Sequence, residues 1–329
     1  MFRFLVKRVL IALLTLLAID IITFSVFFAI PSSPAAVMCS KGCTTERIAM
    51  VNRSLGLDKP KVTQFAEFNK GIFVGRDFDN GVRVDHCPAP CLGYSFRTGE
   101  PVTAIVARAL PVTVSIVLGA AVLWLLVGVS LGVISALRRG TVFDKTAVGV
   151  SLLGASMPVY FFALILITVF VFALKLLAYP QYVPITQNFG AWLVALILPW
   201  LSLVFVQAAA YARISRGQML ETLSEDYIRT ARAVGLPKRT VYLRHALRAA
   251  ITPIVTIFGL DLGSFLGGVA ITETIFGMHG LGWQSVNAVG TLNLPVVMAT
   301  VLIGAVFIVV MNTVVDVMYA FIDPRVKLS

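Results

Sequence analysis

Carboxylates inside apolar runs are the residues of this chain that could carry chemistry in a membrane. Four of them interrupt otherwise apolar stretches: Asp20, Asp261, Glu273 and Asp316. A charged group in lipid is costly, so such residues usually face the interior of a helix bundle or a water-filled path. For Asp261 and Asp316, a path role and a helix-holding role are equally consistent with the sequence. For Glu273, near the end of its run, the structural role is favoured, and Asp20 has no recognisable partner.

The four cysteines form a second group that could do chemistry. Cys39 and Cys43 make one pair, Cys87 and Cys91 the other, and all four lie in the polar segment 31–100. An even number of cysteines outside the reducing cytoplasm predicts two disulfides. Structural zinc is the alternative, but it more often uses C-x₂-C pairs. Three connectivities are possible, and bridges within each pair are favoured because a tight turn can bring such close sulfurs together.

Signals of an enzyme or a nucleotide-binding protein are missing from the sequence. The three histidines, His86, His245 and His279, are scattered and match no metal-binding spacing. There is no G-x-x-x-x-G-K-[ST] phosphate loop and no nucleophile motif. We therefore expect no catalytic residue, no cofactor and no metal in this chain.

Composition places the chain among helical integral membrane proteins. Of 329 residues, 58% are hydrophobic and only 13% are charged, and the mean hydropathy is +0.90. Soluble domains have about 25% charged residues. The formal net charge is +11, but the basic residues lie mostly between apolar runs, which favours membrane topology and anionic lipid over nucleic acid.

The apolar runs predict an all-α protein with about six transmembrane helices. Residues 1–30 hold the first span, residues 31–100 form a folded insert, and residues 101–329 form the transmembrane core. The predicted spans are Val9–Ile30, Leu110–Leu137, Val148–Leu177 with a kink near Pro158, Trp192–Tyr211, Ile254–Ile275 and Pro295–Phe321.

Lysine and arginine define the expected orientation of these spans. They are frequent near the N-terminus, in the 138–145 loop, around 221–250 and in the tail, whereas the 178–191 and 276–294 loops have none. Because basic loops stay in the cytoplasm, both termini are expected there. The 31–100 insert is then extracytoplasmic.

The longest charged stretch of the C-terminal half, 221–253, is predicted to contain two short helices. Thr222 and Glu225 have capping-box spacing and predict a helix start. Gly235 followed by Pro237 predicts its end, because glycine accepts a left-handed conformation and proline cannot continue the helix. A second, basic helix is expected from about Pro237.

The first of these helices has a predicted apolar face, with Arg229 and Arg232 pointing elsewhere. At helical spacing, that face consists of Leu220, Leu223, Tyr227, Ala231 and Val234. Two roles are open from the stretch alone: a helix pair on the membrane surface, or a docking element for a cytoplasmic partner.

This stretch resembles the coupling-loop motif of permease subunits of ABC importers, in the form carried by the dipeptide/oligopeptide/nickel branch. The motif residues are Glu225-Asp226-Tyr227-Ile228, Arg229-Thr230-Ala231-Arg232-Ala233-Val234-Gly235 and His245-Ala246-Leu247-Arg248. Further similar runs are Leu55-Gly56-Leu57-Asp58-Lys59-Pro60, Thr272-Glu273-Thr274-Ile275-Phe276 and the pair Asn312 and Asp316. The resemblance covers most of the chain.

The resemblance implies a prokaryotic inner-membrane protein that is the first permease of a pair. Its expected partners are a second permease subunit, two cytoplasmic ATPase subunits that hold ATP and magnesium, and an extracytoplasmic solute-binding protein. Peptides are the expected cargo by this resemblance, and the sequence leaves open dipeptides, longer peptides, nickel chelates and some sugars.

By the same resemblance, residues 221–250 would include the coupling helix that fits a groove of the ATPase. Its expected contact residues are Asp226, Tyr227, Arg229, Thr230, Ala231, Arg232, Ala233 and Gly235. Small side chains there permit close approach, and the arginines can pair with acidic groups of the partner. Asp261, Asn312 and Asp316 are the candidates for the translocation path.

Two other functions remain open at this stage. A secondary transporter could use Asp261 or Asp316 as a proton site, and a non-transporting membrane scaffold could recruit a cytoplasmic partner through the 221–250 stretch. Copurification with two ATPases and a second permease separates the importer from both.

Overall fold

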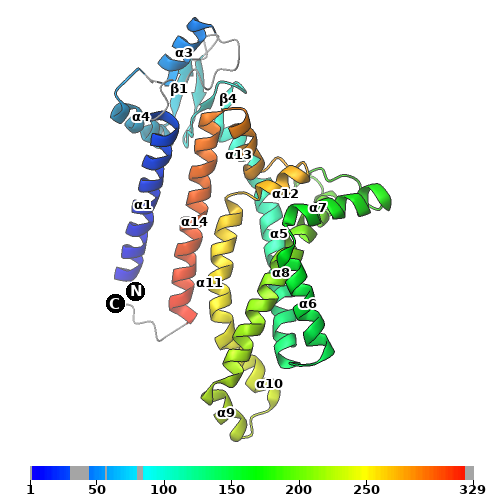
Figure 1. The fold of residues 1–329 in the computed structure, drawn as a ribbon. Helices are drawn as coiled ribbons and strands as arrows, with labels where there is room; N and C mark the ends of the chain where they lie inside the picture. The colour runs from blue at the N-terminus through cyan, green and yellow to red at the C-terminus, as the bar shows by residue number, and fades with distance from the viewer. Residues whose placement is uncertain (1, 30–43, 56–57, 80–83, 323–329) are drawn as a thin grey trace.

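The structure, a computed structural model, describes residues 2–29, 44–55, 58–79 and 84–322 of the chain. In this part, long helices lie side by side and the strands are short (Figure 1). Five helices are long and apolar enough to cross a membrane, and a sixth crossing results if one bent pair counts as a span. The predicted all-α membrane fold is confirmed.

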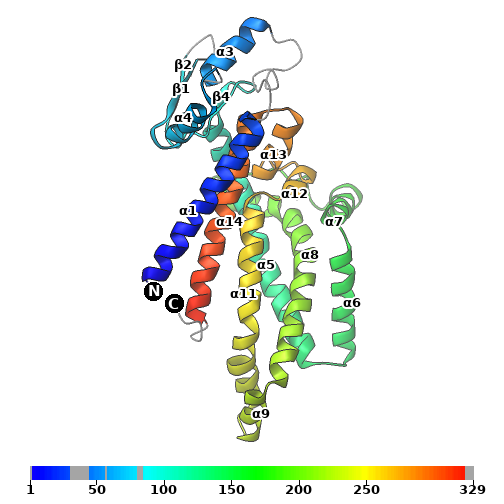
Figure 2. The same ribbon diagram turned by 60° about the vertical axis from the view of Figure 1, so that its left-hand side comes forward.

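The first helix stands at the edge of the bundle. It consists of α1 (Phe2–Phe24) and a π-helical turn, η1 (Ser25–Ala29), and it packs against α14 (Leu294–Ile322) (Figure 2). Its end agrees with the predicted first span Val9–Ile30, but the helix begins earlier, at Phe2.

The described residues of segment 44–101, called the cap below, lie at one end of the molecule (Figures 1 and 2). The cap elements are α3 (Thr45–Leu55), α4 (Lys61–Val74), β1 (Arg76–Asp79), β2 (Val84–Cys87), β3 (Tyr94–Ser95) and β4 (Glu100–Pro101). β1 pairs with β2 and β3 with β4, both antiparallel. Phe24 of α1 meets Phe65 of α4 with ring centroids 5.3 Å apart, so the cap is packed onto the first helix.

Two 36-residue helices form the centre of the bundle, α5 (Val102–Leu137) and α8 (Phe189–Ser224). They pack along their length, and glycines set how close they come. A Cβ atom at Gly132 of α5 would lie 2.4 Å from the carbonyl oxygen of Ala212 on α8, so no larger residue fits there. Small residues at such contacts are typical of membrane helices, whose association depends on close packing.

A bent pair of helices lies between α5 and α8 in sequence. α6 (Val142–Ser156) is followed by α7 (Val159–Leu166) and η2 (Ile167–Ala173), and the two parts meet at an angle of 100°. Pro158 disfavours helical geometry at Met157, which is extended at φ −87° and ψ 127°. The predicted kink near Pro158 in the span Val148–Leu177 is confirmed, but it is a sharp bend between two helices, and the pair is one crossing only if both parts count as a single broken span. α7 instead runs sideways from the bundle (Figure 1).

The C-terminal half completes the bundle. Its remaining elements are α9 (Asp226–Ala233), α10 (Lys238–Thr240), η3 (Val241–Ala246), α11 (Leu247–Leu266), α12 (Ala270–Ile275) and α13 (Leu281–Gly290). The predicted span Ile254–Ile275 is wrong at its end, because the chain breaks at Gly267–Gly268 and α12 is a separate helix. Gly268 has φ +130°, which a residue with a side chain rarely adopts.

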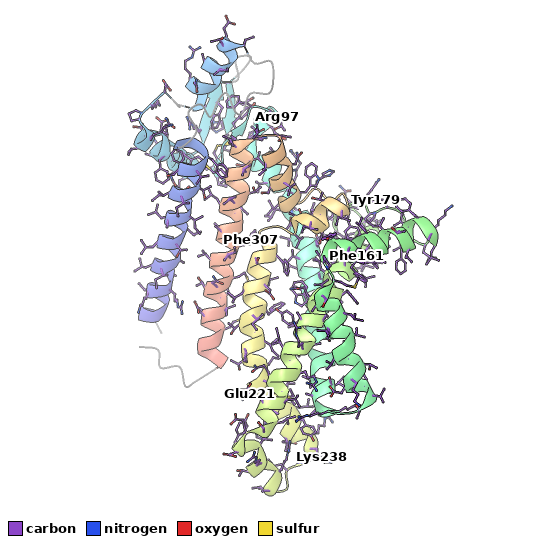
Figure 3. The ribbon with its side chains drawn as sticks, in the orientation of Figure 1. Arg97, Phe161, Tyr179, Glu221, Lys238 and Phe307 are labelled. Carbon is purple, nitrogen blue, oxygen red and sulfur yellow. A yellow bond between two sulfur atoms is a disulfide. The ribbon has the colours of Figure 1, made fainter. Side chains whose placement is uncertain are left out.

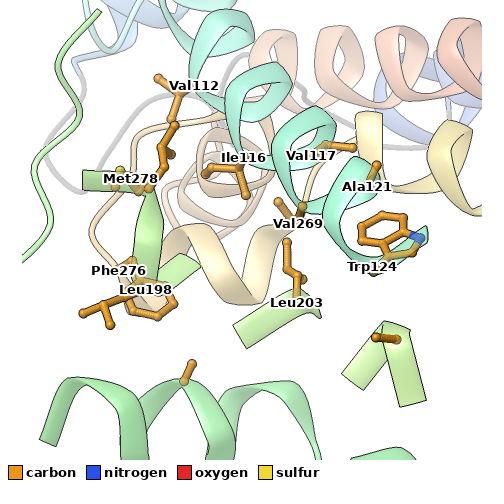
Figure 4. Packing of buried hydrophobic residues seen from close by; sticks show 14 of the residues in the cluster. Val112, Ile116, Val117, Ala121, Trp124, Leu198, Leu203, Val269, Phe276 and Met278 are labelled. Atoms are coloured by element: carbon orange, nitrogen blue, oxygen red, sulfur yellow. The ribbon is translucent and has the colours of Figure 1, made fainter. Parts of the chain in front are cut away.

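The main apolar cluster fills the space between α5, α7, α8 and α11 (Figure 4). Trp124 of α5 is fully buried at its centre. Its ring meets those of Phe258, Phe265 and Tyr211 with centroids 6.2, 5.4 and 6.4 Å apart. α8 and α11, the two helices that flank the predicted docking stretch, therefore both pack against α5 in this cluster.

Candidate functional site

The predicted docking stretch lies at the end of the molecule opposite the cap. α8 runs out of the bundle, α9 and α10 turn at its tip, and η3 leads back into α11 (Figures 1 and 2). Glu221 near the end of α8 and Lys238 at the start of α10 mark the two sides of this tip (Figure 3). The tip therefore joins the bundle helices α8 and α11 through a few short helical elements.

A Schellman motif ends α9, as Gly235 and Pro237 predict. Gly235 has φ +83°, its N–H donates to the carbonyl oxygen of Arg232 at 3.0 Å, and the N–H of Leu236 donates to that of Ala231 at 3.2 Å. These two bonds satisfy carbonyl groups that the helix end would leave free. The turn thus has a defined shape, and Gly235 itself has no side chain between the turn and a partner.

The predicted start of the helix is wrong. α8 continues through Thr222, whose hydroxyl donates back to Gln218, and α9 begins at Asp226 after an extended Glu225. Thr222 is therefore inside a helix rather than capping one. Glu225 alone forms the break between the two helices.

Ile228 is the residue that anchors α9, and the sequence interpretation missed it. It is fully buried among Met219 of α8, Val241 and Ala246 of η3, and Ala250 of α11. The predicted apolar face followed one helical period from Leu220 to Val234. Because the chain breaks at Glu225, the period restarts in α9, and that face is wrong at two of its members.

Those two members, Tyr227 and Val234, point outward. They are 46% and 75% exposed, and Leu236 beside them is 39% exposed. Ala233 and Gly235 are also exposed. Exposed apolar side chains gathered at a projecting tip are typical of a contact site. We call this set, Tyr227, Ala233, Val234, Gly235 and Leu236, the tip surface.

The charges of α9 follow its helix dipole. Asp226 lies in the first turn and Arg232 in the last, which is the favourable order. Arg229 pairs with Asp226 at 3.2 Å on the exposed side, and the Thr230 hydroxyl donates to the Asp226 carbonyl at 3.0 Å. Arg229 therefore has a partner within its own helix.

An ion pair that the sequence interpretation missed lies just behind the tip. Arg216 of α8 contacts Asp144 of α6, and Asp144 also accepts hydrogen bonds from the Ser135 hydroxyl and the Gly140 N–H. Thr141 caps α6 by accepting from the Asp144 N–H at 3.3 Å. The Thr-x-x-Asp spacing of Thr141 and Asp144 is the one local feature of the sequence that indicates a structural position for Asp144, at the start of a helix.

The candidate path residues have different surroundings. Asp261 of α11 accepts a hydrogen bond from the Tyr211 hydroxyl at 2.8 Å. Asp316 of α14 pairs with Arg8 of α1 at 2.6 Å. The side-chain oxygen of Asn312 is buried without a hydrogen-bond partner in the described residues. Asp261 and Asp316 each have a partner on another helix, Tyr211 and Arg8 respectively, and each contact can hold two helices together.

The other two intramembrane acids also have partners. Asp20 accepts from the Asn69 amide of α4 at 2.8 Å, which the sequence did not indicate. Glu273 is fully buried in α12. The Thr113 hydroxyl donates to one of its carboxylate oxygens and the Trp283 N–H to the other, both at 2.7 Å. These contacts agree with the structural role that the sequence favoured for Glu273.

A disulfide joins Cys87 to Cys91 in the cap. The within-pair connectivity is thereby confirmed for this pair, and a bridge from either residue to the other pair is excluded. Cys39 and Cys43 lie outside the described residues, so their bridge stays a prediction.

Two family models match the chain. Residues 1–117 match the N-terminal region of the membrane component of binding-protein-dependent transport systems, and residues 128–328 match the inner membrane component of those systems. The matches together span the cap, the bundle helices and the tip.

Similar proteins are known along the whole chain. A putative peptide transport system permease of Brucella abortus (strain 2308) is 34% identical over 321 residues, 98% of each chain. A probable peptide ABC transporter permease of Sinorhizobium fredii is 32% identical over 98% of this chain and 99% of its own. The dipeptide transport system permease DppB of Escherichia coli K12 is 33% identical over 99% of both.

The family match and the apolar helices agree on the location of the chain, which is a multi-pass protein of the inner membrane. The chain belongs to the family of inner membrane components of binding-protein-dependent transport systems, the permease subunits of ABC transporters.

Proposed function

We propose that this chain is one of two permease subunits of an ATP-driven importer of peptides. The relatives from Brucella, Sinorhizobium and Escherichia are named for peptide or dipeptide transport, and they match this chain from end to end. The second permease subunit would complete the translocation path.

The observation that carries this proposal is the tip surface at the junction of α8 and α11. Ile228 is buried between α8, η3 and α11, so α9 is fixed to both helices. A partner that moves α9 therefore moves two bundle helices together, which is a rigid-body mode of coupling. Two ATPase subunits are the proposed source of that motion, and one of them would bind the tip surface.

The contact with the ATPase would combine apolar and charged groups. Tyr227, Val234 and Leu236 supply exposed apolar area, while Ala231, Ala233 and Gly235 leave room for close approach. Arg232 makes no ion pair among the described residues and is available to an acidic group of the partner. Thr230 and the Asp226–Arg229 pair would border the contact.

In this proposal the tip lies in the cytoplasm, and both termini lie on the same side. The cap then lies outside, where the Cys87–Cys91 bridge keeps a rigid platform for a solute-binding protein. ATP and magnesium would be bound by the ATPase subunits, and this chain would bind neither.

For the path we propose Asp261, Asn312 and Asp316. Asn312 has a buried oxygen without a partner in the described chain, and a buried polar atom of that kind can bind water or cargo. A carboxylate facing water could attract the positive amino end of a peptide.

The test is peptide-stimulated ATP hydrolysis by the reconstituted complex. The permease pair, the two ATPases and the binding protein are placed in proteoliposomes, and ATPase activity and uptake are measured across a panel of dipeptides, longer peptides and nickel chelates. Stimulation by peptides supports the proposal. Uptake driven by a proton gradient without ATPases would favour a secondary transporter, and no uptake with any cargo would favour a scaffold.

A further inference from the structure

A groove with an apolar and a basic end runs along the outside of the bundle. Its apolar part has a volume of about 460 Å³ and lies between α5, α6 and α8 beside α7. Aromatic and aliphatic side chains line it, among them Val150, Phe162, Phe170, Leu201 and Phe205. The sideways course of α7 places Phe162 and Phe170 across the end of the groove farthest from the tip.

The groove continues toward the tip as a second cavity of about 290 Å³. The two cavities share Leu131, Ala147, Ser151 and Ala212, so they are parts of one space. The second part is lined by arginine in addition to apolar residues, namely Arg213 and Arg216 of α8. Polarity therefore increases along the groove in the direction of the tip.

Only one of the two arginines is neutralised. Arg216 donates to both carboxylate oxygens of Asp144, and that carboxylate is further occupied by Ser135 and Gly140. Arg213 is exposed and makes no ion pair with any described residue. The basic end of the groove thus carries one positive charge without a counterion.

A serine hydroxyl lies where the two parts meet. Ser151 lines both cavities, and the residue as a whole is 8% exposed. From Ser151 outward, α6 presents exposed apolar residues such as Val150, Leu152 and Leu153. The groove is therefore bordered by a surface suited to lipid chains.

α6, which borders the groove, is long enough to cross the hydrocarbon of one leaflet of a bilayer. The 15 residues of α6 span about 22 Å at about 1.5 Å per residue, and the hydrocarbon of one leaflet is about 15 Å deep, half of the core. In the proposed orientation the basic end faces the cytoplasm, where anionic headgroups attract arginine.

We propose that this groove binds a phospholipid with an anionic headgroup. The phosphate and headgroup pair with Arg213, the Ser151 hydroxyl donates to an ester oxygen near the glycerol, and one acyl chain fills the apolar part between Phe162 and Phe205. The site uses the proposed orientation but does not depend on the cargo of the importer.

The experiment is native mass spectrometry of the full-length protein in its complex, after exposure to vesicles of equal parts phosphatidylglycerol and phosphatidylethanolamine. We expect wild-type protein to retain phosphatidylglycerol preferentially. Arg213→Gln should lower that retention about fivefold, the effect of one basic residue at an anionic surface. Ala147→Phe, which places a ring in the shared part of the groove, should lower retention of both lipids.

Arg139→Gln is the matched control, because Arg139 is an exposed arginine near the same membrane face and lines neither cavity. It should retain lipid as the wild type does. Equal retention by Arg213→Gln and Arg139→Gln would overturn the proposal. So would efficient cross-linking of Leu152→Cys to a helix of another subunit, since a protein helix would then occupy the groove.

Discussion

Arg216 of α8 donates two hydrogen bonds to Asp144 of α6, from Nε to Oδ1 at 2.7 Å and from Nη2 to Oδ2 at 2.9 Å. Asp144 is buried, and it also accepts from Ser135 at the end of α5. The three helices are thus joined about three turns before α9 begins at Asp226. Motion of the tip would reach α5 and α6 through this contact as well as through α8.

We predict that Arg216→Gln lowers the free energy of unfolding by about 3 kcal/mol, because it leaves a buried carboxylate without its charge partner. Thermal unfolding of the purified protein in detergent measures this. Arg229→Gln is the control: its pair with Asp226 is exposed on both sides and should contribute less than about 0.5 kcal/mol. Equal stability of the two variants would contradict the role given to Asp144.

Thr113→Val should destabilise the protein by about 2 kcal/mol, although it keeps the shape of the side chain. The Thr113 hydroxyl donates to buried Glu273 and accepts from the Leu281 N–H at 2.8 Å, so valine leaves both groups unsatisfied. Thr274→Val is the matched control, since that exposed hydroxyl donates only to the Ala270 carbonyl of its own helix. If both variants melt at the same temperature, the contact between α5 and α12 does not contribute to the stability of the protein.

The Cys87–Cys91 bridge should be found in the mature protein by mass mapping of peptides without reduction. Its loop spans a sequence separation of 4, for which the chain-entropy model gives about 2 kcal/mol of stabilisation. Cys87→Ser should therefore loosen the cap without preventing membrane insertion. Four alkylatable thiols, or zinc in elemental analysis, would contradict this prediction.

The sequence predicted the last span within about one residue, Pro295–Phe321 against Leu294–Ile322. A long apolar run without breaks predicts a single span. The left-handed turn at Gly235 is predicted in the same local way, because glycine adopts that conformation most readily. These features depend on local chemistry, so the sequence contains them.

The features that the sequence missed depend on distant contacts. Pro158 predicts a break in the helix, but the proline alone does not define the 100° angle between the two parts or the direction in which the second part runs. Asp144 and Arg216 are 72 residues apart and share no pattern. Ile228 was missed because the one-residue break at Glu225 restarts the helical period, and that break is defined by packing on α8 and η3.

Asp316→Asn should lower uptake more than it lowers the yield of assembled complex. The pair with Arg8 is partly exposed, with side chains 39% and 31% accessible, and such pairs contribute at most about 1 kcal/mol. Arg8→Gln breaks the same pair and leaves Asp316 in place, so it should reduce uptake less. A parallel loss of yield and uptake in Asp316→Asn would show that Asp316 only holds α14 against α1.

The central claim, that the tip surface couples ATP hydrolysis to the bundle, is tested most directly at Gly235. Its φ of +83° strains any β-branched residue, and a Cβ atom there meets no other atom of the described residues within 4 Å, so Gly235→Val alters the turn and its outer surface without disturbing the core. Gly235→Asn is the control, because asparagine tolerates this conformation.

The measurement is the ratio of peptide uptake to ATP hydrolysis in proteoliposomes containing the complete complex. We predict that Gly235→Val inserts normally, that its uptake is abolished while ATP hydrolysis continues without stimulation by peptide, and that Gly235→Asn keeps most of its uptake. Normal, peptide-stimulated uptake by Gly235→Val would contradict the account of α9 as the coupling helix.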